Sequence, residues 1–474
     1  MIGWADEVAE DEKTKEVETL LGDPKKAILA MAIPTTVALV AQSVNNLVDA
    51  AWVSGLGRDA LAAVGLFFPV FFIIIGVSTG IGIGAASAIS KRIGAENKAE
   101  ADRTAAHAIV LVLIGSVVMT ALLVLFLEPI IRMLGTGAEE GTIQECINYG
   151  LPVVVFMGIF MVTGVLANIL RAEGAAKRAM YVLILAAVIN LVLDPFFIYD
   201  HGLGWGMTGA ALATVVAESI ALSAMLYWYF VKKDLYLRFR FKGFKFESVI
   251  IKDIFRVGIP ASLQMTIISV VSIFMNLILL EAGGDDGVAI YSSDWRLLSI
   301  LTIPLMGIAT GVVPVCAAAF GAKRYDKVKT AYTYALKISV LLMIAVCAVT
   351  IIFASHMVLA FTYDPGTEYL RGGMAEFLRI AALFLPFMAM GMVAESLFQA
   401  LGMGVRSLAS TLFRNLLMVP LCYVAMIATT GLTYIWWGAT FSEVIASAIV
   451  VVWSFYVLRN VMKGYDIKRK SADA

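Results

Sequence analysis

Long apolar runs alternate with short polar connections along almost the whole chain. About 20 apolar residues cross the hydrocarbon core of a bilayer as a helix, and backbone groups in lipid must bond within the segment. Each run is therefore predicted to be a membrane-spanning helix. The twelve expected spans are 26–52, 61–90, 101–127, 143–170, 176–199, 207–231, 250–281, 287–319, 329–354, 374–401, 405–430 and 435–459. Several exceed 25 residues, which predicts tilt or extension beyond the hydrocarbon core.

Lysine and arginine gather on alternate connections between these spans. The N-terminal tail, the loops after even-numbered helices and the C-terminus hold most of them, including the run at 232–252. The opposite loops offer little beyond Arg58, Arg132 and Arg371. The positive-inside rule then predicts a multi-pass protein of the cell membrane with both termini in the cytoplasm.

The two halves of the chain resemble each other at a steady offset. Ile33-Pro34 opens the first span, and Ile259-Pro260 opens the seventh. The Gly80-x-x-x-Gly84 motif of the second span matches Gly307-x-x-x-Gly311 of the eighth. Such a motif indicates close packing between helices. Two six-helix bundles of the same topology follow, related by an axis along the membrane normal.

We therefore expect an all-α integral membrane fold with twelve transmembrane helices in two pseudo-symmetric six-helix bundles around a central cleft. The expected parts are an acidic cytoplasmic tail at 1–22, an N-lobe at 23–231, a basic linker at 232–249, a C-lobe at 250–460 and a cytoplasmic tail at 461–474. Two lobes around a cleft suit alternating access. Duplication can also build channels or membrane enzymes, so this pattern alone leaves those classes open.

Composition supports one large membrane domain. Hydrophobic residues make up 60% of the chain and charged residues 15%, against about a quarter in soluble proteins. The formal net charge of zero argues against a nucleic-acid partner. The four cysteines and three histidines are scattered, so we expect neither a disulfide framework nor a zinc site.

Polar residues break the symmetry between the halves. Asp49 in the first span and Asp194 in the fifth each follow an asparagine by four residues, which places each pair on one helix face. The equivalent positions in the second half are Met275 and Cys422. Because ionisable groups inside a membrane are costly and usually functional, the two aspartates are the strongest candidates for a working site.

The depths of these groups are similar. Counting from the predicted outer ends of the helices, Asp49 lies about 5 Å deep, Asp194 about 8 Å and Thr214 about 10 Å. The carboxylate and hydroxyl oxygens of these side chains suit a small hard cation. Burial and repulsion between the like charges would instead raise the pKa of one carboxyl and let it carry a proton. The roles of three further acids within the spans stay open at this point: Glu218, Asp294 and Glu395. Arg296 and Lys337 could neutralise some of them, and Glu395 could reach water at the inner end of its helix.

Several motifs resemble those of the multidrug and toxic compound extrusion (MATE) family, in its DinF-like prokaryotic or archaeal branch. They are Trp52-Val-Ser-Gly-Leu-Gly, Leu61-Ala-Ala-Val-Gly-Leu-Phe-Phe-Pro69, Ile169-Leu-Arg171 with Glu173-Gly174, and Asn190-Leu-Val-Leu-Asp-Pro195. The resemblance covers roughly residues 22–460. It implies two lobes in a V shape and export of drug-like cationic or amphiphilic compounds against H⁺ or Na⁺, without enzymatic activity.

The resemblance also implies roles for individual residues. The coupling residues carried over are Asp49, Asn190, Asp194 and Thr214, with Tyr149 nearby, and a Na⁺ ion could bind the first four. Gln42, Asn45 and Asn46 are expected to line the substrate cavity, although Asn45 stands where relatives often have an aromatic residue. We expect no cofactor besides the coupling ion, small-molecule substrates and membrane lipids as partners, and a monomer. A flippase for lipid-linked precursors is the alternative function.

Overall fold

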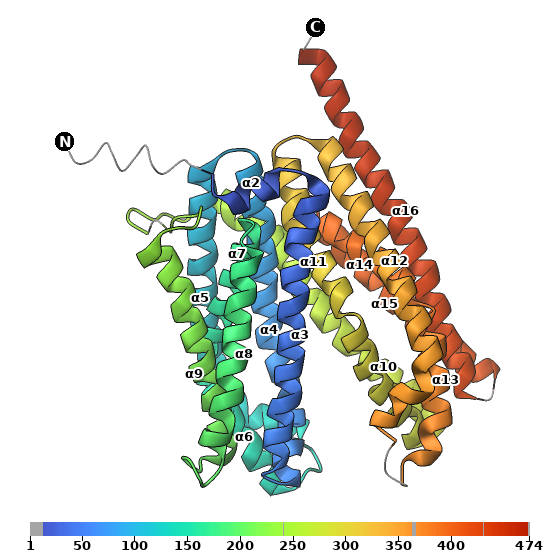
Figure 1. The fold of residues 1–474 in the computed structure, drawn as a ribbon. Coiled ribbons are helices and arrows are strands. Elements are labelled where there is room, and N and C mark those ends of the chain that lie inside the picture. Colours follow the sequence, from blue (N-terminus) through green and yellow to red (C-terminus); the bar gives the residue numbers. More distant parts are fainter. Residues whose placement is uncertain (1–12, 240, 363–365, 430, 473–474) are drawn as a thin grey trace. The chain divides into compact units, whose positions relative to one another are not determined.

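The computed structural model describes residues 13–239, 241–362, 366–429 and 431–472, the last nine of them by their backbone only. Figure 1 shows these residues as long helices with short connections. Ten described helices are long and apolar enough to cross a membrane, and two bent helix pairs raise this number to twelve. Each predicted span overlaps a helix or helix pair, so the all-α prediction is confirmed.

The chain forms two compact units, each of which includes one short segment from the other half of the sequence. Unit 1 contains residues up to Gly22 and Val37–Ser262, and unit 2 contains Asp23–Thr36 and Leu263–Ala474. The helices of unit 1 are α2 (Lys15–Leu21), most of α3 (Pro24–Ser54), α4 (Arg58–Gly94), α5 (Lys98–Leu134), α6 (Glu140–Val155), α7 (Met157–Ala172), α8 (Ala176–Ile198), α9 (Gly206–Leu226), the π-helix η1 (Tyr227–Lys232) and the beginning of α10 (Ser248–Leu301).

Unit 2 holds the second half of the repeat. Its further helices are α11 (Ile303–Gly321), α12 (Tyr325–Met357), the 3₁₀ turns η2 (Val358–Ala360) and η3 (Glu368–Leu370), α13 (Arg371–Ala382), α14 (Leu385–Ala400), α15 (Gly404–Ala428) and α16 (Leu432–Ala472). The connection expected between the spans 250–281 and 287–319 is a kink at Gly284, whose φ of 60° is non-helical.

The two halves bend at equivalent residues. The predicted span 143–170 is broken at Phe156 by 56°, and its counterpart 374–401 is bent by 49° after Leu383. Glu96 and Lys323, which follow the matching glycine motifs of the two halves, both adopt a left-handed backbone conformation, with φ values of 57° and 56°. The internal repeat predicted from the sequence is therefore a repeat of backbone conformation.

The paired glycine motifs pack helices closely, as expected. Gly84 of α4 leaves no room for a Cβ atom because the carbonyl oxygen of Ile254 in α10 lies against it. In unit 2, Gly307 lies equally close to Thr36 of α3. The compact units thus differ in their bounds from the expected lobes at 23–231 and 250–460. The first turns of α3 pack with the helices of the second half, and the first turns of α10 pack with those of the first half.

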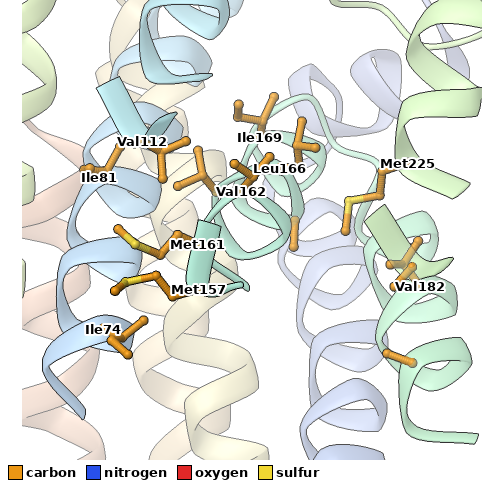
Figure 2. Close-up of a cluster of buried hydrophobic side chains, with 14 of the residues drawn as sticks. Ile74, Ile81, Val112, Met157, Met161, Val162, Leu166, Ile169, Val182 and Met225 are labelled. Carbon is orange, nitrogen blue, oxygen red and sulfur yellow. The ribbon is translucent and has the colours of Figure 1, made fainter. Parts of the chain in front are cut away.

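The core of unit 1 is built around α7. Figure 2 shows Met157, Met161 and Val162 of this helix lying among side chains of neighbouring helices, which include Ile74 of α4 and Val112 of α5. Both methionine side chains are fully buried. Flexible thioether side chains fill irregular space of this kind. This core fixes the helices on which the polar groups of unit 1 lie.

The last residues of the acidic tail expected at 1–22 form a short helix, α2. The Thr14 side chain caps α2 by accepting a hydrogen bond from the Val17 backbone. Val17 and Leu20 are buried in unit 1, while Glu18 is exposed. The acidic residues before Lys13 lie outside the described residues.

Candidate ion-coupling site

Helix α8 supplies the buried centre of the site. Asn190 and Asp194 lie one turn apart on the same face and are 3% and 0% exposed. The Asn190 amide nitrogen donates a hydrogen bond of 2.7 Å to Asp194 Oδ1. Pro195 is accommodated within α8, which continues to Ile198.

Helix α3 brings Asp49 to Asp194. The two carboxyl groups lie within hydrogen-bonding reach of each other. Asp49 Oδ1 and Asp194 Oδ2 are both buried and receive no hydrogen bond from any described donor. Two carboxylates in such contact repel each other unless a proton or a small cation lies between them. The structure therefore brings these two aspartates together, and their role in coupling stays a prediction.

Asn190 connects the carboxyl pair to two further polar groups. Its side-chain oxygen accepts a 2.8 Å hydrogen bond from the Asn45 amide, and its nitrogen also lies 3.3 Å from Thr214 Oγ1. The Thr214 hydroxyl donates to the carbonyl oxygen of Ala210, so its own oxygen is available as an acceptor. The network thus spans α3, α8 and α9.

Asn45 belongs to this network rather than to the face of Gln42 and Asn46. Asn45 and Asp49 lie one helical turn apart and face α8, whereas Gln42 and Asn46 are exposed on another face of α3. The cavity role expected for all three residues stays a prediction. In the sequence, the four-residue spacing that Asn45 and Asp49 share with Asn190 and Asp194 is the signal that Asn45 lies with the aspartates.

Tyr149 of α6 lies within electrostatic range of the carboxyl pair. Its ring packs edge-on against Phe67, with ring centroids 5.5 Å apart. The hydroxyl is close enough to Asp49 and Asp194 for their charges to act on it. Glu218 lies one turn after Thr214 on the same face of α9, so a second acid follows the network along this helix.

No basic side chain among the described residues forms an ion pair with Asp49 or Asp194, and this distinguishes the two halves of the protein. In unit 2, Arg414 of α15 pairs with Glu395 of α14 at 3.0 Å and with Glu443 of α16 at 2.7 Å. These three side chains are largely buried.

Arg414 neutralises Glu395 and Glu443. It is neither Arg296 nor Lys337, the two basic residues that the sequence suggests for this role. Glu395 is held inside unit 2 by an ion pair, and the expectation that it simply reaches water is wrong. Asp294 is different: it is fully buried, and neither of its carboxyl oxygens has a partner among the described residues.

Comparison with known proteins agrees with this architecture. The MatE family model matches the chain twice, at residues 34–196 and 260–424, so the two matches begin at equivalent prolines of the repeat. The multidrug export protein MepA of Staphylococcus haemolyticus is 24% identical over 437 residues, covering 92% of this chain and 94% of MepA. MepA of Staphylococcus aureus is 25% identical over 440 residues, with the same coverage.

Solved structures are similar over almost the whole chain. One is an outward-facing multidrug resistance MATE transporter of the MOP superfamily, with a TM-score of 0.91 and 38% identity over 95% of this chain and 99% of that one. Another is a MOP superfamily transporter from Pyrococcus furiosus, described as having a binding pocket of reverse polarity, with a TM-score of 0.92, 38% identity and the same coverage. Together with the repeated family match, these similarities show that the chain belongs to the MATE family of membrane transporters.

Proposed function

We propose that this protein is a secondary-active multidrug exporter of the cell membrane. It exchanges cationic or amphiphilic organic compounds for H⁺ or Na⁺ by alternating access, with both termini in the cytoplasm. The family supports export, since the similar proteins are named multidrug export proteins and a multidrug resistance transporter. The basic connections between the helices support the orientation.

The contact between Asp49 and Asp194 carries the proposal for coupling in the N-terminal half. Asp194 is fully buried, Asp49 is half-buried with its Oδ1 atom covered, the two carboxyl groups lie in contact, and no described basic group compensates them. A proton or cation at the pair allows α3 and α8 to stay close, and its loss makes the carboxylates repel each other. Ion binding thereby favours one packing of these helices, and it affects drug affinity as far as the drug distinguishes the two packings.

The orientation of Asn190 supports H⁺ over Na⁺. Its side-chain oxygen already accepts from Asn45, and its nitrogen points at Asp194 and Thr214. This orientation presents a donor, not an oxygen, to the carboxyl pair. A Na⁺ ion bound by all four expected residues would need the amide to turn over and give up these contacts, whereas a proton needs no such change.

Transport into proteoliposomes tests this proposal. A fluorescent cationic drug is followed under an imposed pH gradient and, separately, a Na⁺ gradient. We expect wild type and the control Asp285→Asn, an exposed aspartate of unit 2, to move the drug under at least one gradient. Asp49→Asn and Asp194→Asn should each reduce the driven rate at least tenfold at equal reconstitution.

Two outcomes would overturn this function. If both variants kept the wild-type driven rate, the aspartates would have no coupling role. If correctly folded wild type moved no drug under either gradient but equilibrated a fluorescent lipid-linked precursor between leaflets, the flippase alternative would replace export.

A further inference from the structure

We propose that the segment joining the two repeats carries a docking surface for anionic phospholipid headgroups, formed by the basic and aromatic side chains of residues 241–246. We call these residues the linker turn. The inference goes beyond the proposed export function, because it depends neither on the driving ion nor on the drug.

The linker is fixed to unit 1 on both sides of this turn through its own backbone. The N–H groups of Leu237 and Arg238 donate to the carboxylates of Glu173 at 3.0 Å and Asp102 at 2.9 Å. Beyond the turn, the N–H group of Glu247 donates at 3.0 Å to Nε2 of His107. All three acceptor side chains belong to buried residues, so the turn is held between firm anchors.

The start of the linker is held by charge as well. Asp234 forms a bidentate ion pair with Arg178 and a second pair with Lys232. Hydrogen bonding to the Arg178 guanidinium lowers the pKa of the Asp234 carboxyl to about 2. This pair therefore stays charged at physiological pH, and Asp234 is already neutralised by its own partners.

Between the anchors, a tight turn exposes one lysine at its tip. The Phe244 backbone N–H donates to the carbonyl oxygen of Phe241 at 3.1 Å, and Gly243 adopts a φ of 75° that other residues rarely take. Lys242 occupies the exposed position before this glycine. Lys245 and Phe246 follow on the exposed side, and the rings of Phe244 and Phe246 pack against His107.

An aromatic row connects the turn to the apolar surface of a spanning helix. Phe230 and Val231, at the end of the candidate span 206–232, are 44% and 66% exposed. The Phe239 ring lies 5.9 Å from that of Phe230 and is stacked 6.2 Å from that of Phe241, centroid to centroid. The linker turn therefore begins where the lipid-facing surface of this helix ends. Aromatic residues concentrate at this boundary of a bilayer.

The charge of the surface selects the kind of lipid. Within the described part of the chain, Lys242 and Lys245 form no ion pair, while the neighbouring Glu247 is paired with Arg103 at 2.9 Å. Two lysines beside the exposed rings of Phe241 and Phe246 match a phosphate-bearing headgroup above an apolar acyl region. A polybasic site of this kind prefers anionic over zwitterionic lipid, by roughly tenfold or more for two lysines.

Lipid binding to the whole protein tests this inference. The purified transporter is titrated with phosphatidylglycerol or phosphatidylcholine in detergent, and bound lipids are counted by native mass spectrometry. We expect wild type to bind phosphatidylglycerol more tightly at a countable site. Lys242→Gln with Lys245→Gln should lose most of this preference, whereas Lys242→Arg with Lys245→Arg should keep it.

The matched control is Lys323→Gln with Lys329→Gln, which removes two exposed lysines from unit 2 and should leave the preference unchanged. The inference fails if wild type shows no preference for phosphatidylglycerol. It also fails if the Lys242 and Lys245 glutamine variant binds both lipids as wild type does, or if the control loses as much preference as that variant.

Discussion

At the scale of single residues, Asn190 organises the candidate site. One amide joins three helices: its oxygen accepts from Asn45 of α3, and its nitrogen serves Asp194 of α8 and Thr214 of α9. Asn190 is 3% exposed, so water cannot easily replace these contacts. Removing the partner of a buried polar group costs more free energy than removing the partner of an exposed one, because water can replace only the exposed hydrogen bond.

Replacement of Asn190 by alanine should therefore weaken both stability and coupling. The change removes the amide that donates to Asp194, and we expect a loss of about 1–3 kcal/mol in unfolding free energy and a clear fall in gradient-driven transport. Thermal unfolding in detergent and proteoliposome transport measure the two effects. Asn415→Ala is the control, because the Asn415 amide donates to a carbonyl of its own helix and should change both quantities little. Equal effects from both substitutions would contradict the role of Asn190.

At the scale of helices, close packing at glycine positions determines which helices meet. Gly80 and Gly84 of α4 accept the beginning of α10, and Gly307 and Gly311 accept the beginning of α3. Without a hydrophobic driving force between helices in lipid, such close approach is a main source of association. At Gly84 an added methyl group would meet the backbone carbonyl oxygen of Ile254, which cannot turn aside.

Gly84→Ala should lower the melting temperature, because its Cβ would collide with the carbonyl group of Ile254. Overpacking of this kind typically costs about 1–3 kcal/mol. Gly65→Ala in the same helix is the control, since no atom lies within 4 Å of its added Cβ. We expect Gly65→Ala to leave the melting temperature unchanged or slightly higher, as alanine favours helix over glycine. If Gly84→Ala were as stable as the control, the close contact would not hold these helices together.

Most elements were predictable from the sequence, because lipid forces each apolar run to become a helix. The bends at Phe156 and Leu383 were not, since a hydropathy average taken over a whole span does not register a bend within it. Within the site, the spacing of Asn190 and Asp194 revealed their shared face. The pairing of Arg414 with Glu395 and Glu443 escaped prediction because it joins three different helices.

At the scale of the whole molecule, a repeated backbone carries unequal chemistry. The two halves share their bends and left-handed turns at equivalent positions of the repeat. Yet Asp49 and Asp194 of unit 1 contact each other with no described basic side chain paired to them, while Glu395 and Glu443 of unit 2 share Arg414. A buried ion pair is a fixed structural element, whereas an uncompensated carboxyl pair must take up an ion. The unequal chemistry of the duplicated fold thus favours ion coupling in its first half.

The most direct test of this assignment is the affinity of the purified protein for a cationic drug, measured as pH and Na⁺ concentration are varied separately. Coupling through the carboxyl pair predicts that raising the concentration of one of these cations tenfold weakens drug binding by up to tenfold in wild type. The same dependence is expected in Asp294→Asn, which alters a buried aspartate of the second half. In Asp194→Asn the affinity should no longer depend on that cation. A drug affinity that still followed the cation in Asp194→Asn as it does in wild type would contradict the assignment.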